Sequence, residues 1–208
     1  MAPADPEPPG VDVVVGPDGR LRCPWAGSAD RSDPDYLDYH DREWGREVHG
    51  EQPLLERLCL EAFQSGLSWL TILRKRENFR RAFARFDPEV VAAYTERDVE
   101  TLMQDASIVR NRRKIEATIG NARATVGLRP AGGLEALFWS ARPPMHRRPV
   151  RLHEVPPKTG ESAALAADLK AAGFAHLGPT TVYAAMQACG VVDDHLEGCF
   201  RAVPTPLA

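Results

Sequence analysis

Apolar residues recur along most of this chain at the three- and four-residue spacing of amphipathic helices, and the alternation typical of strands is nearly absent. Two helix starts are marked by Asp33 and Asp87, each followed by proline, and Thr95 with Asp98 approximates a capping box. The chain is therefore predicted to be all-α, with helices at residues 34–44, 51–64, 68–84, 88–94, 96–104, 111–126, 133–139, 161–172 and 179–189.

The segments outside this helical pattern suggest the domain organisation. Residues 1–22 are rich in proline, glycine and acidic residues, and their longest apolar run, 13–15, is too short for a signal-peptide core or a membrane span. We therefore expect a disordered N-terminal tail, a cytoplasmic protein without membrane attachment, one folded domain over 23–200, and a C-terminal tail at 201–208. The prolines of 141–160 preclude a continuous helix and predict a connector between two helical lobes.

One acidic residue interrupts an apolar helix face. Glu61 shares its helical spacing with Leu54, Leu58 and Ala62, so its side chain is predicted to face the core. A carboxylate buried without a partner costs several kcal/mol, which means that something must hydrogen-bond to it. An internal arginine or a helix-end amide is one such partner, and a ligand is another.

The net charge is −3, but the basic residues are clustered. One cluster lies between residues 74 and 85 with Glu77 as its only acidic neighbour, and others contain Arg110, Arg112, Arg113 and Lys114, and Arg142, Arg147, Arg148 and Arg151. A short turn around residues 107–110 is predicted to present backbone N–H groups at a helix N-terminus, which favours an anion such as DNA phosphate. Solvated helix faces and an ordinary helix hairpin explain the same features.

Four candidate metal ligands lie near the two ends of the chain: Cys23, His40, His195 and Cys199. Two thiolates with two imidazoles suit tetrahedral zinc, and four protein ligands would close its coordination shell, as in structural sites. His195 and Cys199 would share one face if their segment is helical. The spacing is not that of a standard zinc finger, so the residues alone also allow an incidental grouping. Cys59 and Cys189 fall in apolar helical patterns and are predicted to be core residues.

Aromatic residues gather in the first third of the chain. Tyr36 and Tyr39 are three positions apart and lie on one predicted helix face, with Trp44 and Trp69 following. This pattern is typical either of core packing or of an aromatic-walled pocket.

Several motifs occur together in one order: YLDYHDREWG (36–45), LEAFQSGLSW (60–69), RKRENF (74–79), DASIVRNRRKI (105–115), IGNAR (119–123), GPTTVYAAMQACG (178–190) and DDHLEGC (193–199). They closely resemble the 3-methyladenine DNA glycosylase I family, within the helix-hairpin-helix glycosylase superfamily. The resemblance runs from Cys23 to about Phe200. It implies a two-lobed helical enzyme that flips 3-methyladenine out of alkylated duplex DNA and hydrolyses its N-glycosidic bond. An abasic site remains, and no lyase step follows.

The resemblance also implies roles for individual residues. Glu61 is the carboxylate that contacts the extruded base and serves catalysis, and the pocket aromatics are Tyr36, Tyr39, Trp44 and Trp69. Leu67 lies at the gap left in the DNA, and the hairpin contacts come from Ser107, Ile108, Val109, Arg110, Arg112 and Lys114. One structural zinc per chain is bound by Cys23, His40, His195 and Cys199, and we expect a monomer.

Two positions depart from the family pattern. Ser107 stands where the hairpin usually carries glycine, and a non-glycine residue in a left-handed turn costs roughly 1 kcal/mol. Asp193 stands where the family usually has asparagine. One interpretation makes Asp193 a second catalytic carboxylate beneath the sugar, and the other makes it a helix cap or a hydrogen-bond partner of a ligand histidine.

Two other functions fit the sequence without the resemblance. A non-enzymatic DNA-binding domain would use the hairpin and the basic helices, with the aromatic residues as core. A tRNA- or nucleotide-modifying enzyme would prefer single-stranded RNA. The sequence does not indicate how far the pocket tolerates 3-methylguanine.

Overall fold

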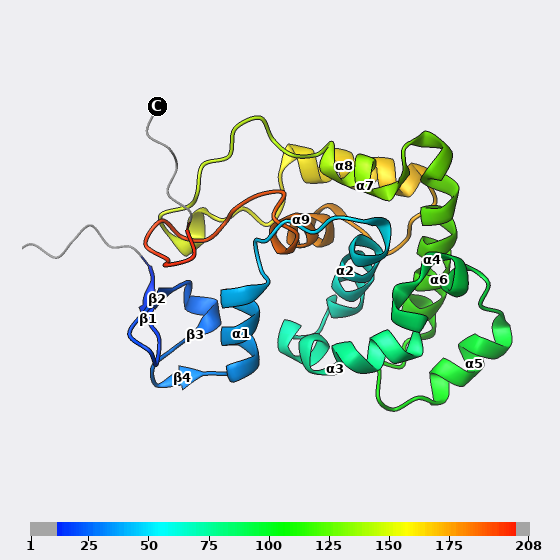
Figure 1. The fold of residues 1–208 in the computed structure, drawn as a ribbon, viewed down its shortest axis with the longest axis horizontal. Coiled ribbons are helices and arrows are strands. Elements are labelled where there is room, and N and C mark those ends of the chain that lie inside the picture. The colour runs from blue at the N-terminus through cyan, green and yellow to red at the C-terminus, as the bar shows by residue number, and fades with distance from the viewer. Residues whose placement is uncertain (1–11, 203–208) are drawn as a thin grey trace, which may run out of the picture.

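The computed structural model describes residues 12–202, and within them all nine predicted helices are present with ends at most two residues from their expected positions (Figure 1). They are α1 (Pro34–Arg42), α2 (Glu51–Gln64), α3 (Trp69–Ala82), α4 (Pro88–Ala92), α5 (Glu96–Gln104), α6 (Arg112–Leu128), α7 (Gly133–Trp139), α8 (Gly160–Ala171) and α9 (Pro179–Ala188). Short 3-10 helices occur at η1 (Pro24–Ala26), η2 (Ala84–Phe86), η3 (Arg129–Ala131) and η4 (Leu152–Glu154).

Local capping explains why several helices begin where they do. The Asp33 carboxylate accepts a hydrogen bond from the Asp35 amide at 3.0 Å, and Asp87 accepts from the first-turn amides of α4. The Thr95 amide donates to Asp98 at 2.7 Å, which confirms the capping box of α5. These bonds satisfy amides that have no partner within their own helices.

Helix α2 is the centre of the molecule. It packs against α3, α6, α7 and α9, and its buried side chains include Leu54, Leu58 and Phe63. The Phe63 ring contacts Phe79 of α3 at a centroid distance of 4.6 Å, and fully buried Phe83 and Phe86 continue this aromatic row. Because α2 is surrounded on most sides, a charged residue on it is held in a largely apolar environment.

The N-terminal region differs from the predicted tail. Residues 12–22 are part of the fold: β1 (Val14–Val15) and β2 (Leu21–Arg22) pair as an antiparallel hairpin, and β3 (Gly27–Ser28) pairs with β4 (Arg31–Ser32). Arg22, which is 3% exposed, donates to Asp18 and to Asp41 of α1. This buried ion pair anchors the hairpin, and the prediction of disorder was wrong for residues 12–22. The rest of that predicted tail, residues 1–11, and residues 203–208 lie outside the described part of the chain.

Two parts of the molecule face each other across α1. In Figure 1 the short strands and the C-terminal segment gather at one end, and the helices from α2 to α7 form the other. The proline-rich connector runs from α7 across to the C-terminal segment, where the Glu197 amide donates to the Pro149 carbonyl at 3.0 Å, and then returns to α8. From residue 12 to residue 202, none of the helices combines the length and apolar character needed to cross a membrane.

Candidate active site

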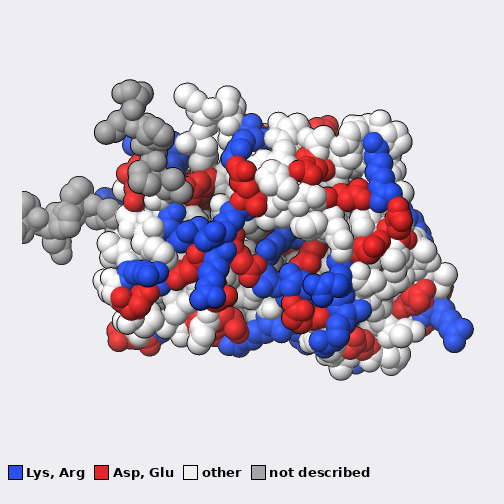
Figure 2. All heavy atoms as spheres, in the orientation of Figure 1, with Lys and Arg blue, Asp and Glu red and all other residues white. Residues whose placement is uncertain are grey.

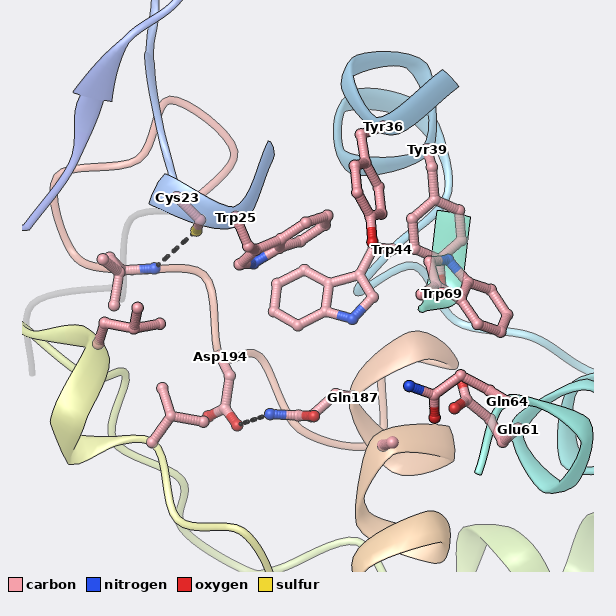
Figure 3. A pocket seen from close by; sticks show the side chains of 14 residues that line it. Cys23, Trp25, Tyr36, Tyr39, Trp44, Glu61, Gln64, Trp69, Gln187 and Asp194 are labelled. Atoms are coloured by element: carbon pink, nitrogen blue, oxygen red, sulfur yellow. Dashed lines mark hydrogen bonds between the residues drawn. The ribbon is translucent and has the colours of Figure 1, made fainter. Parts of the chain in front are cut away.

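A cavity of about 300 Å³ lies among α1, α2, α3 and α9 (Figure 3). Five aromatic side chains line it: Trp25, Tyr36, Tyr39, Trp44 and Trp69. Four of them were predicted from sequence, and Trp25, which comes from η1, was not. The Trp25 and Trp44 rings lie 5.0 Å apart and the Tyr39 and Trp69 rings 5.3 Å apart, so the walls suit a flat aromatic ligand.

Polar atoms at the cavity edge are held in fixed positions. The Tyr36 hydroxyl accepts a hydrogen bond from the Leu70 amide at 3.2 Å, which leaves its own proton free to donate. The Trp69 Nε1 atom is buried and has no hydrogen-bond acceptor within the described chain. A ligand with acceptor atoms would satisfy both groups.

Glu61 enters the cavity from the last turns of α2 and is 6% exposed. Neither internal partner expected from sequence reaches it. Arg57 donates instead to Glu43, at 2.8 Å, and none of the helix-end amides in the described chain donates to Glu61. No residue between 12 and 202 donates a hydrogen bond to the Glu61 carboxylate. Burial raises the pKa of Glu61 to about 8, and the nearby Arg57 charge offsets only part of this effect.

A second carboxylate at the cavity, Asp194, was missed by the sequence interpretation. It is 4% exposed and accepts hydrogen bonds from Tyr183 Oη and Gln187 Nε2, both at 2.7 Å, while His146 Nε2 lies 2.9 Å from its Oδ1. Burial alone raises the pKa of Asp194, but the bonds from His146, Gln187 and Tyr183 outweigh burial and hold the pKa below its usual value. Gln64 and Gln187 also line the cavity and were not singled out.

Asp193 does not line the cavity. Its Oδ1 lies 2.9 Å from His195 Nδ1 and also accepts from the His195 amide, and its Oδ2 lies 3.5 Å from Arg148. The segment from 193 to 199 is not helical, so the prediction that Asp193 caps a helix was wrong, as was the expectation that His195 and Cys199 share a helix face. Of the roles considered for Asp193, only hydrogen bonding to a candidate ligand histidine agrees with this geometry.

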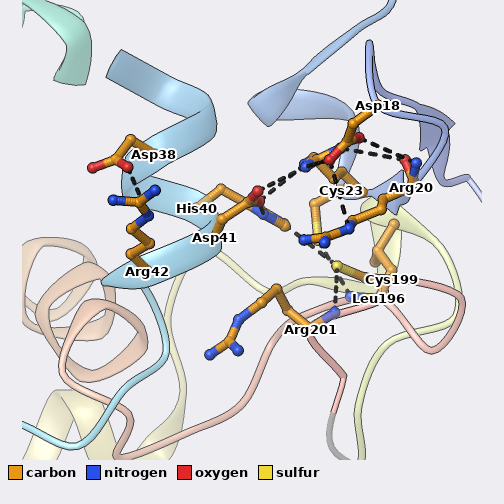
Figure 4. Close-up of polar contacts among 11 residues, drawn as sticks. Asp18, Arg20, Cys23, Asp38, His40, Asp41, Arg42, Leu196, Cys199 and Arg201 are labelled. Carbon is orange, nitrogen blue, oxygen red and sulfur yellow. Dashed lines mark hydrogen bonds and ion pairs between the residues drawn. The ribbon is translucent and has the colours of Figure 1, made fainter. Parts of the chain in front are cut away.

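Three of the four predicted metal ligands, from both ends of the chain, meet in one buried cluster (Figure 4). The ligand atoms of Cys23, His40 and Cys199 all lie within 4.8 Å of one another, and Cys199 Sγ is 3.4 Å from His40 Nε2. The close contact of the two sulfurs lowers the pKa of Cys199 against the effect of burial, with a further contribution from His40, whereas contact with Cys199 and burial raise the pKa of Cys23. One of the two sulfurs is therefore ready to act as a thiolate ligand.

His195 lies beside this cluster, with its ring 5.1 Å from that of His40. Its Nε2 atom is buried and has no hydrogen-bond partner among residues 12–202. A Cβ atom at Gly45 would lie 2.7 Å from His195 Cε1, and Gly45 has a φ of 76°, so only glycine lets the chain pass this close to the ring. The backbone at Gly45 therefore packs directly against the ring of His195.

The turn between α5 and α6 differs from the sequence expectation at Ser107. Ser107 is absent from the residues that adopt positive φ, so the expected strain of a left-handed serine was wrong. Its amide donates to Asp105 Oδ1 at 2.8 Å, and its carbonyl accepts from Lys75 and Asn78 of α3. These contacts hold the turn in an ordinary conformation. Among the described non-glycine residues, positive φ occurs at Ala84, Arg85, Phe86 and His176, and His176 lies in the turn between α8 and α9.

The side chains predicted to contact DNA lie in different environments. Ile108 is buried in the core and Val109 is half-buried. Arg112 is paired with Glu96 and Glu100, and Lys114 Nζ donates to the carbonyls of Phe63 and Ser65, so both stabilise the fold. Arg110 is exposed and has no ion pair among residues 12–202.

Half of the basic residues between 74 and 85 are neutralised by ion pairs. Arg74 is paired with Asp33 and Asp35, Arg76 with Glu43, and Arg80 with Glu56 and Glu77. The interpretation that Glu77 alone balances this run was wrong, because carboxylates distant in sequence fold against it. Figure 2 accordingly shows basic and acidic side chains interspersed on the visible face.

Leu67 occupies the loop between α2 and α3 and is 40% exposed. Gly66, with φ of 82°, forms the bend in front of it, and the Leu67 amide donates to the Gln64 carbonyl at 2.7 Å. Because Gln64 lines the cavity, this loop presents Leu67 next to the cavity residues. The Lys114 ammonium group stabilises this loop by donating a hydrogen bond to the Ser65 carbonyl.

The helical fold thus surrounds an aromatic cavity with a buried carboxylate that no described residue hydrogen-bonds, an arrangement suited to a flat ligand that donates hydrogen bonds. Residues 26–202 match the family model described as methyladenine glycosylase, and the chain belongs to this family.

Known proteins of the family are similar over most of their length. DNA-3-methyladenine glycosylase 1 of Escherichia coli strain K12 is 47% identical over 181 residues, which cover 86% of this chain and 95% of the relative. A crystal structure of 3-methyladenine DNA glycosylase I has a TM-score of 0.82 and 44% identity, covering 86% of this chain and 98% of its own. A Staphylococcus aureus structure described as the structural basis of 3-methyladenine recognition has a TM-score of 0.78 and 37% identity, covering 81% and 91%.

Proposed function

We propose that this protein flips 3-methyladenine out of alkylated duplex DNA into the aromatic cavity and hydrolyses its N-glycosidic bond, leaving an abasic site without a lyase step. The observation that carries the proposal is Glu61, which is buried at the cavity and receives no hydrogen bond from residues 12–202. Such a carboxylate is retained at the expense of stability, and a bound base that donates hydrogen bonds accounts for it. Family membership supports the same reaction.

The chemistry of the lesion matches the cavity. A 3-methylated adenine in DNA carries positive charge, which weakens its glycosidic bond and attracts the faces of aromatic rings by roughly 0.5–2 kcal/mol each. Damaged, poorly stacked bases are also the least costly to flip. Glu61 accepts a hydrogen bond from the exocyclic amine and balances the positive charge, and water then attacks the sugar. Leu67 is the side chain that fills the gap left by the flipped nucleotide.

A structural zinc, one per chain, fits the residues present. His40 and His195 each place Nδ1 against an aspartate, Asp41 at 2.8 Å and Asp193 at 2.9 Å, which leaves both Nε2 atoms for a metal. The amides of Leu196 and Arg201 donate to the sulfurs of Cys23 and Cys199 at 3.4 Å, as expected for thiolates. The four residues would close the shell of a tetrahedral ion, and the ion would supply structure only.

Replacing Asp193 by asparagine is expected to lower metal affinity roughly 10- to 100-fold, because it removes the carboxylate that orients His195. Excision of 3-methyladenine and of an uncharged lesion is expected to proceed at wild-type rates when zinc occupancy is matched. Chelator competition measures the affinity, and Asp41→Asn, which alters the equivalent bond on His40, is the matched variant. A loss confined to the uncharged lesion would instead assign Asp193 to catalysis.

The proposed DNA surface consists of Leu67 and the helix-hairpin-helix element formed by α5, the turn at 105–111, and α6. Arg110→Gln is expected to flatten the slope of log affinity against log salt by roughly one unit, because this exposed arginine is free to contact a phosphate. Arg112→Gln is the matched control and should leave the slope unchanged, since Glu96 and Glu100 already pair with Arg112. Equal slopes for wild type and Arg110→Gln would remove Arg110 from the DNA surface.

One assay tests the proposed activity. Methylated duplex DNA is incubated with excess protein, the released bases are separated by chromatography, and the strands are analysed for breaks before and after alkali. Release of 3-methyladenine with strands that break only after alkali is the expected result. A non-enzymatic DNA-binding domain would release no base, and an RNA-modifying enzyme would be competed by single-stranded RNA better than by duplex DNA. We further propose that the protein acts in the cytoplasm as a monomer.

A further inference from the structure

The polar side of the cavity contains a hydrogen-bond chain that ends on Gln187. Three groups surround the Asp194 carboxylate: Tyr183 Oη and Gln187 Nε2 donate to Oδ2 at 2.7 Å each, and His146 Nε2 lies 2.9 Å from Oδ1. Tyr183 and His146 lie behind Asp194, toward the connector and away from the aromatic walls, and neither lines the cavity. Asp194 is thus held from one side and contacts Gln187 on the other.

This arrangement fixes the orientation of the Gln187 amide. A glutamine side chain has a donor end and an acceptor end, and a carboxylate surrounded by donors only accepts. The Nε2 end of Gln187 must therefore face Asp194. Figure 3 shows Gln187 between Asp194 and the α2 residues Glu61 and Gln64, with its amide oxygen on the side away from Asp194. None of residues 12–202 donates a hydrogen bond to this oxygen.

We infer that Asp194 is a positioning residue that fixes the Gln187 amide oxygen toward the bound base, and that Gln187 determines specificity together with Glu61. This inference rests on the proposed function and names the property of the base that the site selects. Adenine presents an exocyclic amino donor where guanine presents a carbonyl acceptor. The fixed Gln187 oxygen and the ionised Glu61 carboxylate are both acceptors, so together they favour the amino group and oppose the carbonyl. The unpaired Trp69 Nε1 can donate to a ring nitrogen, which both purines have, so it does not discriminate.

The selectivity for 3-methyladenine over 3-methylguanine tests this inference. In Asp194→Asn the side chain at 194 offers both an oxygen and an amino group, so the Gln187 amide is free to reverse. The ratio of 3-methyladenine to 3-methylguanine released from methylated duplex DNA is expected to fall roughly tenfold, as for one lost hydrogen bond in a buried site. Tyr183→Phe is the matched control, because it removes another donor from the same Oδ2 atom and leaves the carboxylate in place.

A second variant separates positioning from direct contact. Gln187→Met keeps the side-chain length, removes the amide, and lies away from the candidate metal ligands. It is expected to weaken the binding of 3-methyladenine roughly tenfold, whereas the binding of 3-methylguanine should not show the same loss. Adding Asp194→Asn to Gln187→Met should then change the ratio no further, because Asp194 acts through Gln187. Binding of both free bases, followed by quenching of tryptophan fluorescence, provides a readout that is independent of DNA cleavage.

Distinct outcomes overturn the inference and the proposed function. If Asp194→Asn alters the ratio no more than Tyr183→Phe, or alters it equally in the Gln187→Met background, Asp194 does not act through Gln187. Equal losses of both bases in Gln187→Met would remove the specificity role. If wild-type protein releases no methylated base, the proposed function fails, and the free-base affinities still decide whether Gln187 discriminates between the two purines.

Discussion

Glu61→Gln is expected to reduce excision of 3-methyladenine roughly 10- to 100-fold while making the folded protein more stable. Excision falls because the glutamine amide lacks the negative charge that balances the cationic base. In addition, the amino end of the amide and the exocyclic amino group of the base are both hydrogen-bond donors and cannot pair. Stability rises because the buried carboxylate, which has no hydrogen-bond donor in the described chain, is replaced by a neutral group of the same shape. Single-turnover base release and denaturant unfolding measure the two effects.

The raised pKa of Glu61, about 8, gives this prediction a pH dependence with a definite sign. The unfolded chain releases this proton near the ordinary pKa of glutamate, so between there and about pH 8 the folded state binds more protons than the unfolded state. The stability contributed by the neutral carboxyl is complete below the unfolded pKa and is lost as pH rises through the folded pKa. The difference in unfolding free energy between Glu61→Gln and wild type should therefore grow with pH and reach roughly 5 kcal/mol above pH 8.

The same titration affects base binding in the opposite direction. A cationic base prefers the ionised carboxylate, so binding should release a proton near neutral pH, and affinity for the base should increase toward pH 8 in wild type only. Gln64→Ala is the matched control, because it changes another cavity residue of α2 that carries no charge. If Glu61→Gln excises the lesion at the wild-type rate, or shows the same pH profile, the base site lies elsewhere.

The helices were predictable because their signals are local. Caps such as Asp87 and the Thr95–Asp98 box fix helix starts through neighbouring amides, and apolar spacing identifies the buried face. The N-terminal hairpin was not predictable in this way. Its order depends on Arg22, which pairs with Asp41, 19 positions further along the chain, and local composition does not report such a pair.

The site shows the same division between local and distant information. The motifs around residues 36–45 and 60–69 identified Glu61 and four of the five cavity aromatics. The sequence could not predict which of two adjacent aspartates faces the cavity. Asp193 and Asp194 lie in a non-helical segment, where no periodicity assigns the directions of side chains. The basic residues were misjudged for a similar reason. Arg112 and Lys114 resemble phosphate ligands in sequence, but Glu96, Glu100 and the free carbonyls at the end of α2 occupy them.

Removal of the proposed structural zinc from its four proposed ligands is expected to have the largest effect on stability. The ligands Cys23 and His40 come from the first fifth of the chain and His195 and Cys199 from its end, so an ion bound by all four joins segments distant in sequence. Without it, the fold retains buried thiols and an unpaired His195 Nε2 at this point. Complete chelation is expected to lower the unfolding free energy by at least about 4 kcal/mol, as for a ligand at roughly 1,000 times its dissociation constant.

Elemental analysis of the purified protein should find close to one zinc per chain. Cys199→Ser should lose the zinc and match the stability of the chelated protein, whereas Cys59→Ser serves as the matched control, since Cys59 is buried in the core away from the cluster. The Cys59→Ser protein is expected to keep the metal and to lose only the part of the unfolding free energy that the packing of this one core side chain contributes. Because the cavity residues Trp25 and Trp44 contact His40 and His195, metal loss should also loosen the cavity and weaken base binding. Chelated protein that unfolds at the same denaturant concentration as the untreated protein would show that the cluster stabilises the fold without an ion.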